Sequence, residues 1–130
     1  MDKPSLYNPL TLAYLGDAVL DLYVRDYIVR QKNKKPNELH RLSTQYVSAK
    51  SQGQTYEALL EMNFFTDEEK DVLMRGRNAK SHTKAKNTDV VTYKKSTALE
   101  AVIGFLHLSG EEARLQSLLD TIIQLCESRD

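Results

Sequence analysis

Two acidic residues lie inside strongly apolar stretches of the chain, where a carboxylate needs a partner. Asp17 lies within residues 12–20 and Glu100 within residues 96–105, and each has a glycine nearby, Gly16 and Gly104. Glycine costs roughly 1 kcal/mol relative to alanine inside a helix. A carboxylate beside a core-facing stripe must find a cation, a hydrogen-bond donor or a metal ion. The pattern therefore predicts two helices that approach closely and share a carboxylate site.

The small neighbours of the two acids favour this convergence. Ala13 leaves room beside Asp17, and Ala101 leaves room beside Glu100. If the two small faces cross, the carboxylates converge, and oxygen ligands with no Cys or His nearby suit a hard cation such as Mg²⁺ or Mn²⁺. Mg²⁺ typically takes only one or two protein carboxylates and completes its shell with water and phosphate. Such a site could activate water on a nucleic-acid substrate.

A purely structural interpretation of the same residues stays open. Gly16 and Gly104 could simply allow tight packing, with Asp17 bonded to a neighbouring arginine or backbone amide and Glu100 on a solvated edge. Asp21 lies one turn after Asp17 on the same face. It could be a further ligand, an outer partner of the site or a surface acid.

Length and composition are typical of one globular domain. The chain has 130 residues, of which 41% are hydrophobic, enough for a single continuous core. No apolar run approaches the ~20 residues of a membrane span, and the N-terminal residues do not resemble a signal peptide. The single cysteine, Cys126, excludes an internal disulfide. We expect a cytoplasmic protein of one domain that makes no membrane contact.

The formal net charge of zero conceals a strongly basic segment, residues 75–95. This basic segment holds seven Lys and Arg residues against one acid, Asp89, and carries +6, which leaves −6 on the rest of the chain. Clustered Lys and Arg residues are how proteins engage phosphate backbones. The segment therefore predicts a nucleic-acid partner.

Spacings of three and four between apolar residues predict an all-α fold. The expected helices cover about residues 9–30, 38–47, 49–62, 67–77, 95–108 and 111–126. Asn8 and Asn37 are expected N-caps, and Thr66 with Glu69 fits a capping box. Residues 78–92 are poor in apolar side chains and are expected to form a long basic loop, a kind of loop that is often functional.

At this point the two acidic stretches resemble the ribonuclease III family. Residues 14–20, Tyr-Leu-Gly-Asp-Ala-Val-Leu, match the second half of the family signature, and residues 100–104, Glu-Ala-Val-Ile-Gly, match its second catalytic segment. The two motifs occur in the family's order with the basic segment between them. The stand-alone size and residues 75–81 and 86–90 look like the Mini-ribonuclease III branch, which has no appended double-stranded RNA-binding domain. The resemblance covers the chain from Asn8 to the last expected helix, as one catalytic domain over residues 1–130.

This resemblance implies an all-α, ribonuclease III-type endonuclease domain that acts as a homodimer on double-stranded RNA. Hydrolysis would depend on Mg²⁺, with Mn²⁺ as a substitute, and leave 5′-phosphate and 3′-hydroxyl ends, each protomer cutting one strand. Asp17 and Glu100 carry over as the catalytic metal ligands. The branch is associated with maturation of large-subunit (23S) ribosomal RNA precursors, which makes such a precursor the expected substrate and a large-subunit ribosomal protein a candidate partner.

Three positions depart from the pattern of the longer family members. Leu10 and Ala13 stand where those enzymes have carboxylates in the first motif, and Thr97 stands where they have an aspartate. Fewer carboxylates are thus expected around the metal. The Thr97 hydroxyl could orient a metal-bound water or bond to its own helix backbone.

Because the resemblance implies no separate RNA-binding domain, the basic segment is expected to contact RNA itself. A-form RNA is recognised largely through its shape, phosphates and 2′-hydroxyls. Phosphate contacts are expected from Arg75, Arg77, Lys80, Lys84 and Lys86, and hydrogen bonds from Asn78, His82 and Thr83. A merely solvated loop is the alternative for the segment.

Two rival functions remain at this level, a non-catalytic RNA-binding member of the same fold and a helical protein adaptor. Retention of both Asp17 and Glu100 argues against the first, and the basic segment is unexplained by the second. Four tyrosines at helix-like intervals are expected to build the core or the dimer interface, namely Tyr7, Tyr14, Tyr23 and Tyr27.

Overall fold

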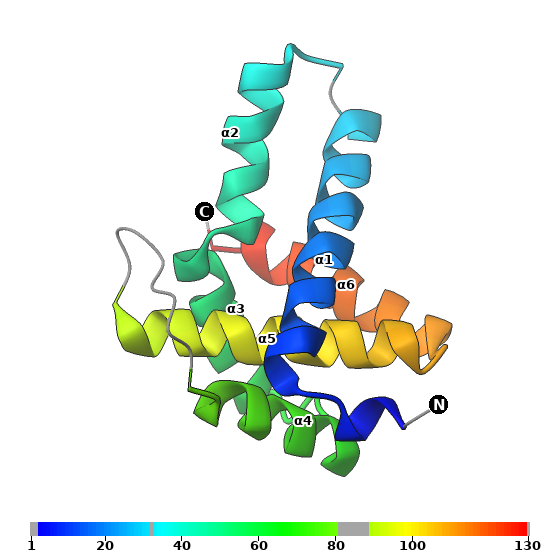
Figure 1. Ribbon diagram of the computed structural model, residues 1–130. Coiled ribbons are helices and arrows are strands. Elements are labelled where there is room, and N and C mark those ends of the chain that lie inside the picture. Colours follow the sequence, from blue (N-terminus) through cyan, green and yellow to red (C-terminus); the bar gives the residue numbers. More distant parts are fainter. Residues whose placement is uncertain (1–2, 32, 81–88, 130) are drawn as a thin grey trace.

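The structure, a computed structural model, describes residues 3–31, 33–80 and 89–129. These residues form an all-α fold, as the sequence predicts (Figure 1). A short 3-10 helix, η1, precedes six α-helices. Their bounds are Pro4–Leu6 for η1, Pro9–Gln31 for α1, Pro36–Val47 for α2, Ala49–Glu61 for α3, Asp67–Asn78 for α4, Val90–Leu108 for α5 and Glu112–Glu127 for α6.

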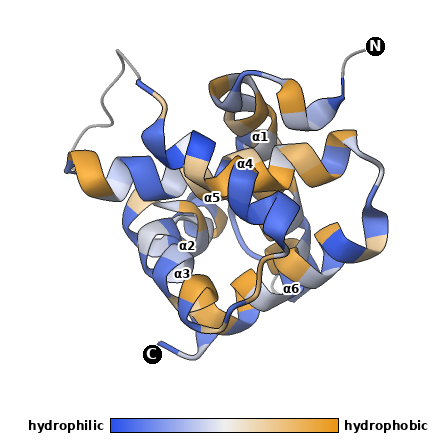
Figure 2. Ribbon diagram, turned by 90° about the horizontal axis from the view of Figure 1, so that it is seen from below, coloured by the Kyte–Doolittle hydropathy of each residue, from blue (hydrophilic) through white to orange (hydrophobic). Residues whose placement is uncertain are grey.

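Helix α5 is the centre of the fold. It contacts η1, α1, α3, α4 and α6, and its residues 96–99 and 101–106 are buried. In Figure 1 it runs across the molecule, with α4 below it and α1 crossing it. Figure 2 shows hydrophilic residues over the outer turns of α4 and hydrophobic residues in α5. A helix that is apolar on nearly all sides must be covered on nearly all sides, which explains why the other elements gather around α5.

Two of the three predicted N-caps form. The Asn8 side chain accepts from the Leu10 amide at 2.8 Å, and Thr66 and Glu69 form the reciprocal capping box at the start of α4. The expected Asn37 cap is wrong, because α2 begins two residues earlier than predicted, at Pro36, with Lys35 in the cap position. Proline suits the first helical position because its fixed φ matches the helix and the amide it lacks would be unpaired there.

Helix α5 also begins five residues earlier than predicted. The expected loop over residues 78–92 is therefore wrong at its C-terminal end, where Val90 to Thr92 are helical. The Asp89 side chain caps the helix by accepting from the Thr92 amide at 2.7 Å. Val90 and Val91 in this first turn are about half exposed, at 51% and 52%, so they do not extend the buried apolar pattern that predicts the rest of α5.

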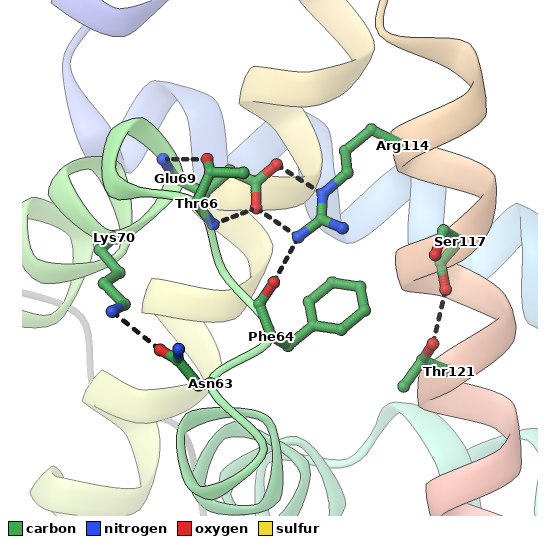
Figure 3. Close-up of polar contacts among 8 residues, drawn as sticks. All are labelled: Asn63, Phe64, Thr66, Glu69, Lys70, Arg114, Ser117 and Thr121. Atoms are coloured by element: carbon green, nitrogen blue, oxygen red, sulfur yellow. Dashed lines mark hydrogen bonds and ion pairs between the residues drawn. The ribbon is translucent and has the colours of Figure 1, made fainter.

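A buried ion pair joins α4 to α6 (Figure 3). The Arg114 guanidinium donates to both carboxylate oxygens of Glu69 at 2.8 Å and to the Phe64 carbonyl, and it lies over the Phe64 ring, 4.2 Å from its centre. Burial opposes the charged form of Glu69, but the hydrogen bonds from Arg114 and from the Thr66 amide outweigh it and lower its pKa. The pair fixes the start of α4 against α6.

Three of the four tyrosines singled out in the sequence pack against the core, and two of them join α1 to α6. Tyr23 donates to Asp120, and Tyr27 donates to Glu127 at 2.7 Å, so both link α1 to α6. Together with Tyr7 they pack against the core. Tyr14 is 84% exposed and lies outside the core. Among the helices of the described ranges, none combines the length and the apolar character that crossing a membrane requires.

Candidate active site

Helices α1 and α5 cross in direct backbone contact at their two glycines. A Cβ built on Gly16 would lie 1.8 Å from the Glu100 carbonyl oxygen, and one on Gly104 would lie 2.0 Å from the Leu12 carbonyl oxygen. No side chain fits at these distances. The close approach predicted from the two glycines is confirmed, and it explains why both helices tolerate glycine in their interiors.

This crossing brings the side chains of Asp17 and Glu100 together. Asp17 is exposed and Glu100 is mostly enclosed, and their carboxyl groups lie within hydrogen-bonding reach of each other. Burial, followed by the hydrogen bond and the charge of Asp17, raises the pKa of Glu100 to about 9. Two carboxylates in contact cannot both carry full charge at low cost, so the metal-free pair holds a proton near neutral pH.

A third side chain, Gln52 from α3, completes the enclosed part of the site. Its amide nitrogen donates to Glu100 Oε2 at 3.3 Å and to the Val47 carbonyl at 2.9 Å. Gln52 is 2% exposed, and its contact with Glu100 favours the charged carboxylate. The sequence analysis missed this residue, because a single glutamine in a polar helix carries no pattern.

The groups at this site that could bind a metal ion are two carboxylates. Across the three described ranges, no cluster of three or more His, Cys, Asp or Glu residues could hold a metal ion. A hard divalent cation with a largely aqueous shell suits two carboxylates. The carboxyl oxygens of Asp17 and Glu100 are the groups that could hold it, with the cation in place of the shared proton.

The two expected outer partners, Asp21 and Thr97, make other contacts. Asp21 pairs with Arg25 one turn on, at 3.0 Å. The Thr97 hydroxyl donates to the Tyr93 carbonyl of its own helix at 3.0 Å, the backbone alternative that the sequence left open. Both side chains are therefore engaged within their own helices.

Within the basic segment, two charges serve the fold. Arg75 donates to the carbonyls of Ser5 and Tyr7 and so tethers the N-terminal segment, a role that the sequence analysis missed. Lys95 pairs with Glu57 of α3 at 2.7 Å.

Of the remaining expected RNA-contacting residues, three lie within the described part of the chain and four lie outside it. Arg77 is half-buried beside the Tyr56 hydroxyl, while Asn78 and Lys80 are exposed at the end of α4 and just beyond it. His82, Thr83, Lys84 and Lys86 lie outside the described residues. The RNA contacts of all these side chains stay predictions.

Comparison with known proteins places these features in a family. The family model for the ribonuclease III domain matches residues 10–111, which include both acids and the basic segment. The chain is 66% identical to a Mini-ribonuclease 3 of Staphylococcus aureus, over 95% of this chain and 92% of the relative. It is 49% identical to a Mini-ribonuclease 3 of Enterococcus faecalis, over 90% and 89% of the two chains.

A solved structure agrees with the fold. A crystal structure of a Fusobacterium nucleatum protein superposes with a TM-score of 0.80 at 31% identity and covers 92% of this chain and 93% of that one. The similarity thus extends over nearly the whole of both chains.

Proposed function

The chain belongs to the Mini-ribonuclease 3 group of the ribonuclease III family and is an endoribonuclease. We propose that it cuts double-stranded RNA with Asp17 and Glu100 as its catalytic residues. The observation that carries this proposal is the contact between the two carboxyl groups at the α1–α5 crossing. Both acids come from family motifs, and the crossing leaves the helix backbones no freedom to separate them.

A divalent cation, Mg²⁺ with Mn²⁺ as a substitute, fits the residues at this site. The carboxylates of Asp17 and Glu100 would hold it, because the mostly enclosed Glu100 lies against Asp17 and a divalent cation would balance the two charges. The buried Gln52 Oε1 atom has no partner among the described groups. When bound, the cation supplies activation of water and stabilisation of the leaving oxygen.

The two acids have different tasks in the hydrolysis. Asp17 is exposed and meets the scissile phosphate from the solvent side, whereas Glu100 stays mostly enclosed and in fixed orientation. A water oxygen forms a bond to phosphorus while the bond from phosphorus to the 3′ oxygen breaks. The attacking water loses a proton and the leaving 3′ oxygen gains one, so that a 5′-phosphate and a 3′-hydroxyl result.

Duplex RNA is held by the basic segment. Asn78 at the end of α4 and Lys80 just beyond it are exposed, so that their side chains can reach phosphates and 2′-hydroxyls. The same proposed RNA surface includes Arg75, Arg77, His82, Thr83, Lys84 and Lys86. Phosphate contacts of this kind make binding depend strongly on salt.

The active form is a homodimer that pairs through α1. Exposed apolar residues gather on one face of this helix, at Tyr14, Ala18, Leu22 and Val29, with Arg25 between the last two. Leu22 is 70% exposed and Val29 is 54% exposed. A second copy of the chain would cover this face, and twofold symmetry would supply the second site that cutting both strands requires. Sedimentation of wild type and Leu22→Lys tests this pairing, with a monomeric variant expected.

The natural substrate is a precursor of large-subunit (23S) ribosomal RNA. A large-subunit ribosomal protein assists its cleavage. The family relationship supports this assignment. Cleavage of a precursor duplex and of an unrelated duplex of equal length, each with and without large-subunit ribosomal proteins, checks it. Equal cutting of both duplexes under all conditions would contradict it.

The decisive experiment measures cleavage of duplex RNA in Mg²⁺, in Mn²⁺ and in EDTA. Asp17→Asn and Glu100→Gln are expected to reduce the rate at least about 100-fold, while RNA binding is retained. Asp26→Asn is the matched control, because Asp26 is an exposed acid on the same helix and pairs only with Arg30 among the described groups. Cleavage in EDTA, or full activity of either site variant, would refute the proposal. Binding without cutting by wild type would favour a non-catalytic RNA-binding protein instead.

A further inference from the structure

Gln52 is a buried polar residue, and packing alone does not explain why a polar side chain stands at this position. It lies in the first turns of α3, is 2% exposed, and reaches across to α5 at Glu100. Its neighbour Gly53 lets α3 approach α5 closely, since a Cβ there would lie 3.3 Å from the Thr92 methyl group. The close approach of α3 and α5 therefore places the Gln52 amide where it meets the carboxylate from inside the protein.

The orientation of this amide is set by the Val47 carbonyl. A carbonyl oxygen accepts hydrogen bonds and cannot donate them, so the group that faces it at 2.9 Å must be the Gln52 NH₂. The same nitrogen then faces Glu100 Oε2 at 3.3 Å. Turning the amide over would place two acceptor oxygens against each other. Gln52 is thereby fixed as a donor toward one chosen oxygen of Glu100.

The cost of this arrangement falls on the other end of the amide. Gln52 Oε1 is buried and has no hydrogen-bond partner among the described groups, although most buried acceptors have one. A leucine would fill a similar space without leaving an acceptor unpaired. Packing alone therefore does not favour glutamine at this position, whereas a donor to Glu100 does.

We propose that Gln52 is a positioning residue of the active site, which holds Glu100 by Oε2 and leaves its other carboxylate oxygen for Asp17 and the cation. This inference rests on the proposed metal site and adds to it the residue that selects the ligating oxygen. Groups that orient a metal ligand typically affect metal affinity or activity about 10- to 100-fold. Gln52 acts through Glu100 and does not itself touch the substrate.

The test is calorimetric titration of the RNA-free protein with Mn²⁺, for wild type, Gln52→Leu and Gln52→Met. Both variants keep the side-chain volume approximately and remove the donor. We expect Mn²⁺ affinity to fall about 10- to 100-fold and kcat on duplex RNA to fall by a similar factor, while KM for RNA stays the same. The matched control is Gln54→Leu, which changes an exposed glutamine of the same helix and is expected to bind Mn²⁺ like wild type.

The outcomes separate this inference from the proposed function. If wild type binds Mn²⁺ and both Gln52 variants bind it equally well at a temperature where they are folded, the role of Gln52 is refuted and the metal site stands. If wild type binds no Mn²⁺ and cuts no RNA, the metal site fails and the role of Gln52 fails with it. A rise in KM with unchanged kcat would also refute positioning, because it would place Gln52 in RNA binding.

Discussion

Replacing Glu100 by glutamine should stabilise the metal-free protein while abolishing its proposed activity. The reason is the raised pKa of Glu100, caused first by burial and then by Asp17. The folded state keeps the Glu100 proton up to about pH 9, whereas the unfolded chain releases it near the ordinary glutamate pKa of 4.5. Between these values the folded protein binds one more proton than the unfolded chain, so its stability falls as pH rises.

The size of this effect follows from the linkage between proton binding and folding. One unit of pKa difference corresponds to about 1.4 kcal/mol, so the contribution of Glu100 declines by about 3 kcal/mol between pH 6 and pH 8. Glutamine at position 100 has the shape of a protonated glutamic acid and keeps the acceptor for Gln52, but it has no proton to release. The variant should therefore lack this part of the pH dependence.

Urea unfolding in EDTA at pH 6 and pH 8 measures the difference. Relative to Glu100→Gln, wild type is expected to lose about 3 kcal/mol in free energy of unfolding over this interval. Glu61→Gln, which changes an exposed acid at the end of α3, should follow wild type. Parallel pH dependences for wild type and Glu100→Gln would show that Glu100 ionises freely in the fold and would refute the reasoning.

Three further changes test other parts of the structure. Gly16→Ala should cost roughly 3 kcal/mol or more in urea unfolding, because its Cβ would lie 1.8 Å from a carbonyl oxygen; a smaller loss than in Gly53→Ala would contradict this. Arg114→Met should cost about 3 kcal/mol near neutral pH, because the buried Glu69 carboxylate would lose its ion-pair partner and keep, among the described groups, only the hydrogen bond from the Thr66 amide. That loss should shrink in acid, because Glu69, with its lowered pKa, stabilises the fold only while charged; an equal loss at every pH would exclude the ion pair as its cause. Lys80→Ala should weaken RNA binding and reduce the slope of log affinity against log salt by about 1, as filter binding over a salt series would detect; an unchanged slope would place Lys80 outside the RNA surface.

The sequence predicts best where a residue type has one physical explanation. Glycines beside acids in two apolar stretches indicate a close crossing, and Gly16 and Gly104 provide it. Threonine three residues before glutamate indicates a capping box, which Thr66 and Glu69 form. The capping box is decided by local chemistry, whereas the crossing is a tertiary contact that the paired motifs of small residues and acids made predictable.

It predicts less well where the contact is distant along the chain. The charge of Arg75 predicts an RNA contact, which stays a prediction, but it does not indicate that the guanidinium also binds carbonyls about seventy residues away. Gln52 contacts Glu100, which is 48 positions away in the sequence, and the spacing of residues within α3 does not predict this contact. The first turn of α5 was missed because its valines are exposed and the Asp89 cap stands in a polar stretch. Tertiary packing supplies what periodicity lacks in each case.

The contact between the backbones of α1 and α5 also bears on how the enzyme fails when it is heated. Because Gly16 and Gly104 leave no side chain between the helices, the two acids are attached at a point that cannot loosen without separating α1 from the central helix. Local fraying of loops or helix ends, which many enzymes suffer first, would leave their spacing intact. Loss of activity on heating should then coincide with cooperative unfolding of the whole domain, and amide hydrogens around the crossing should exchange only by that route.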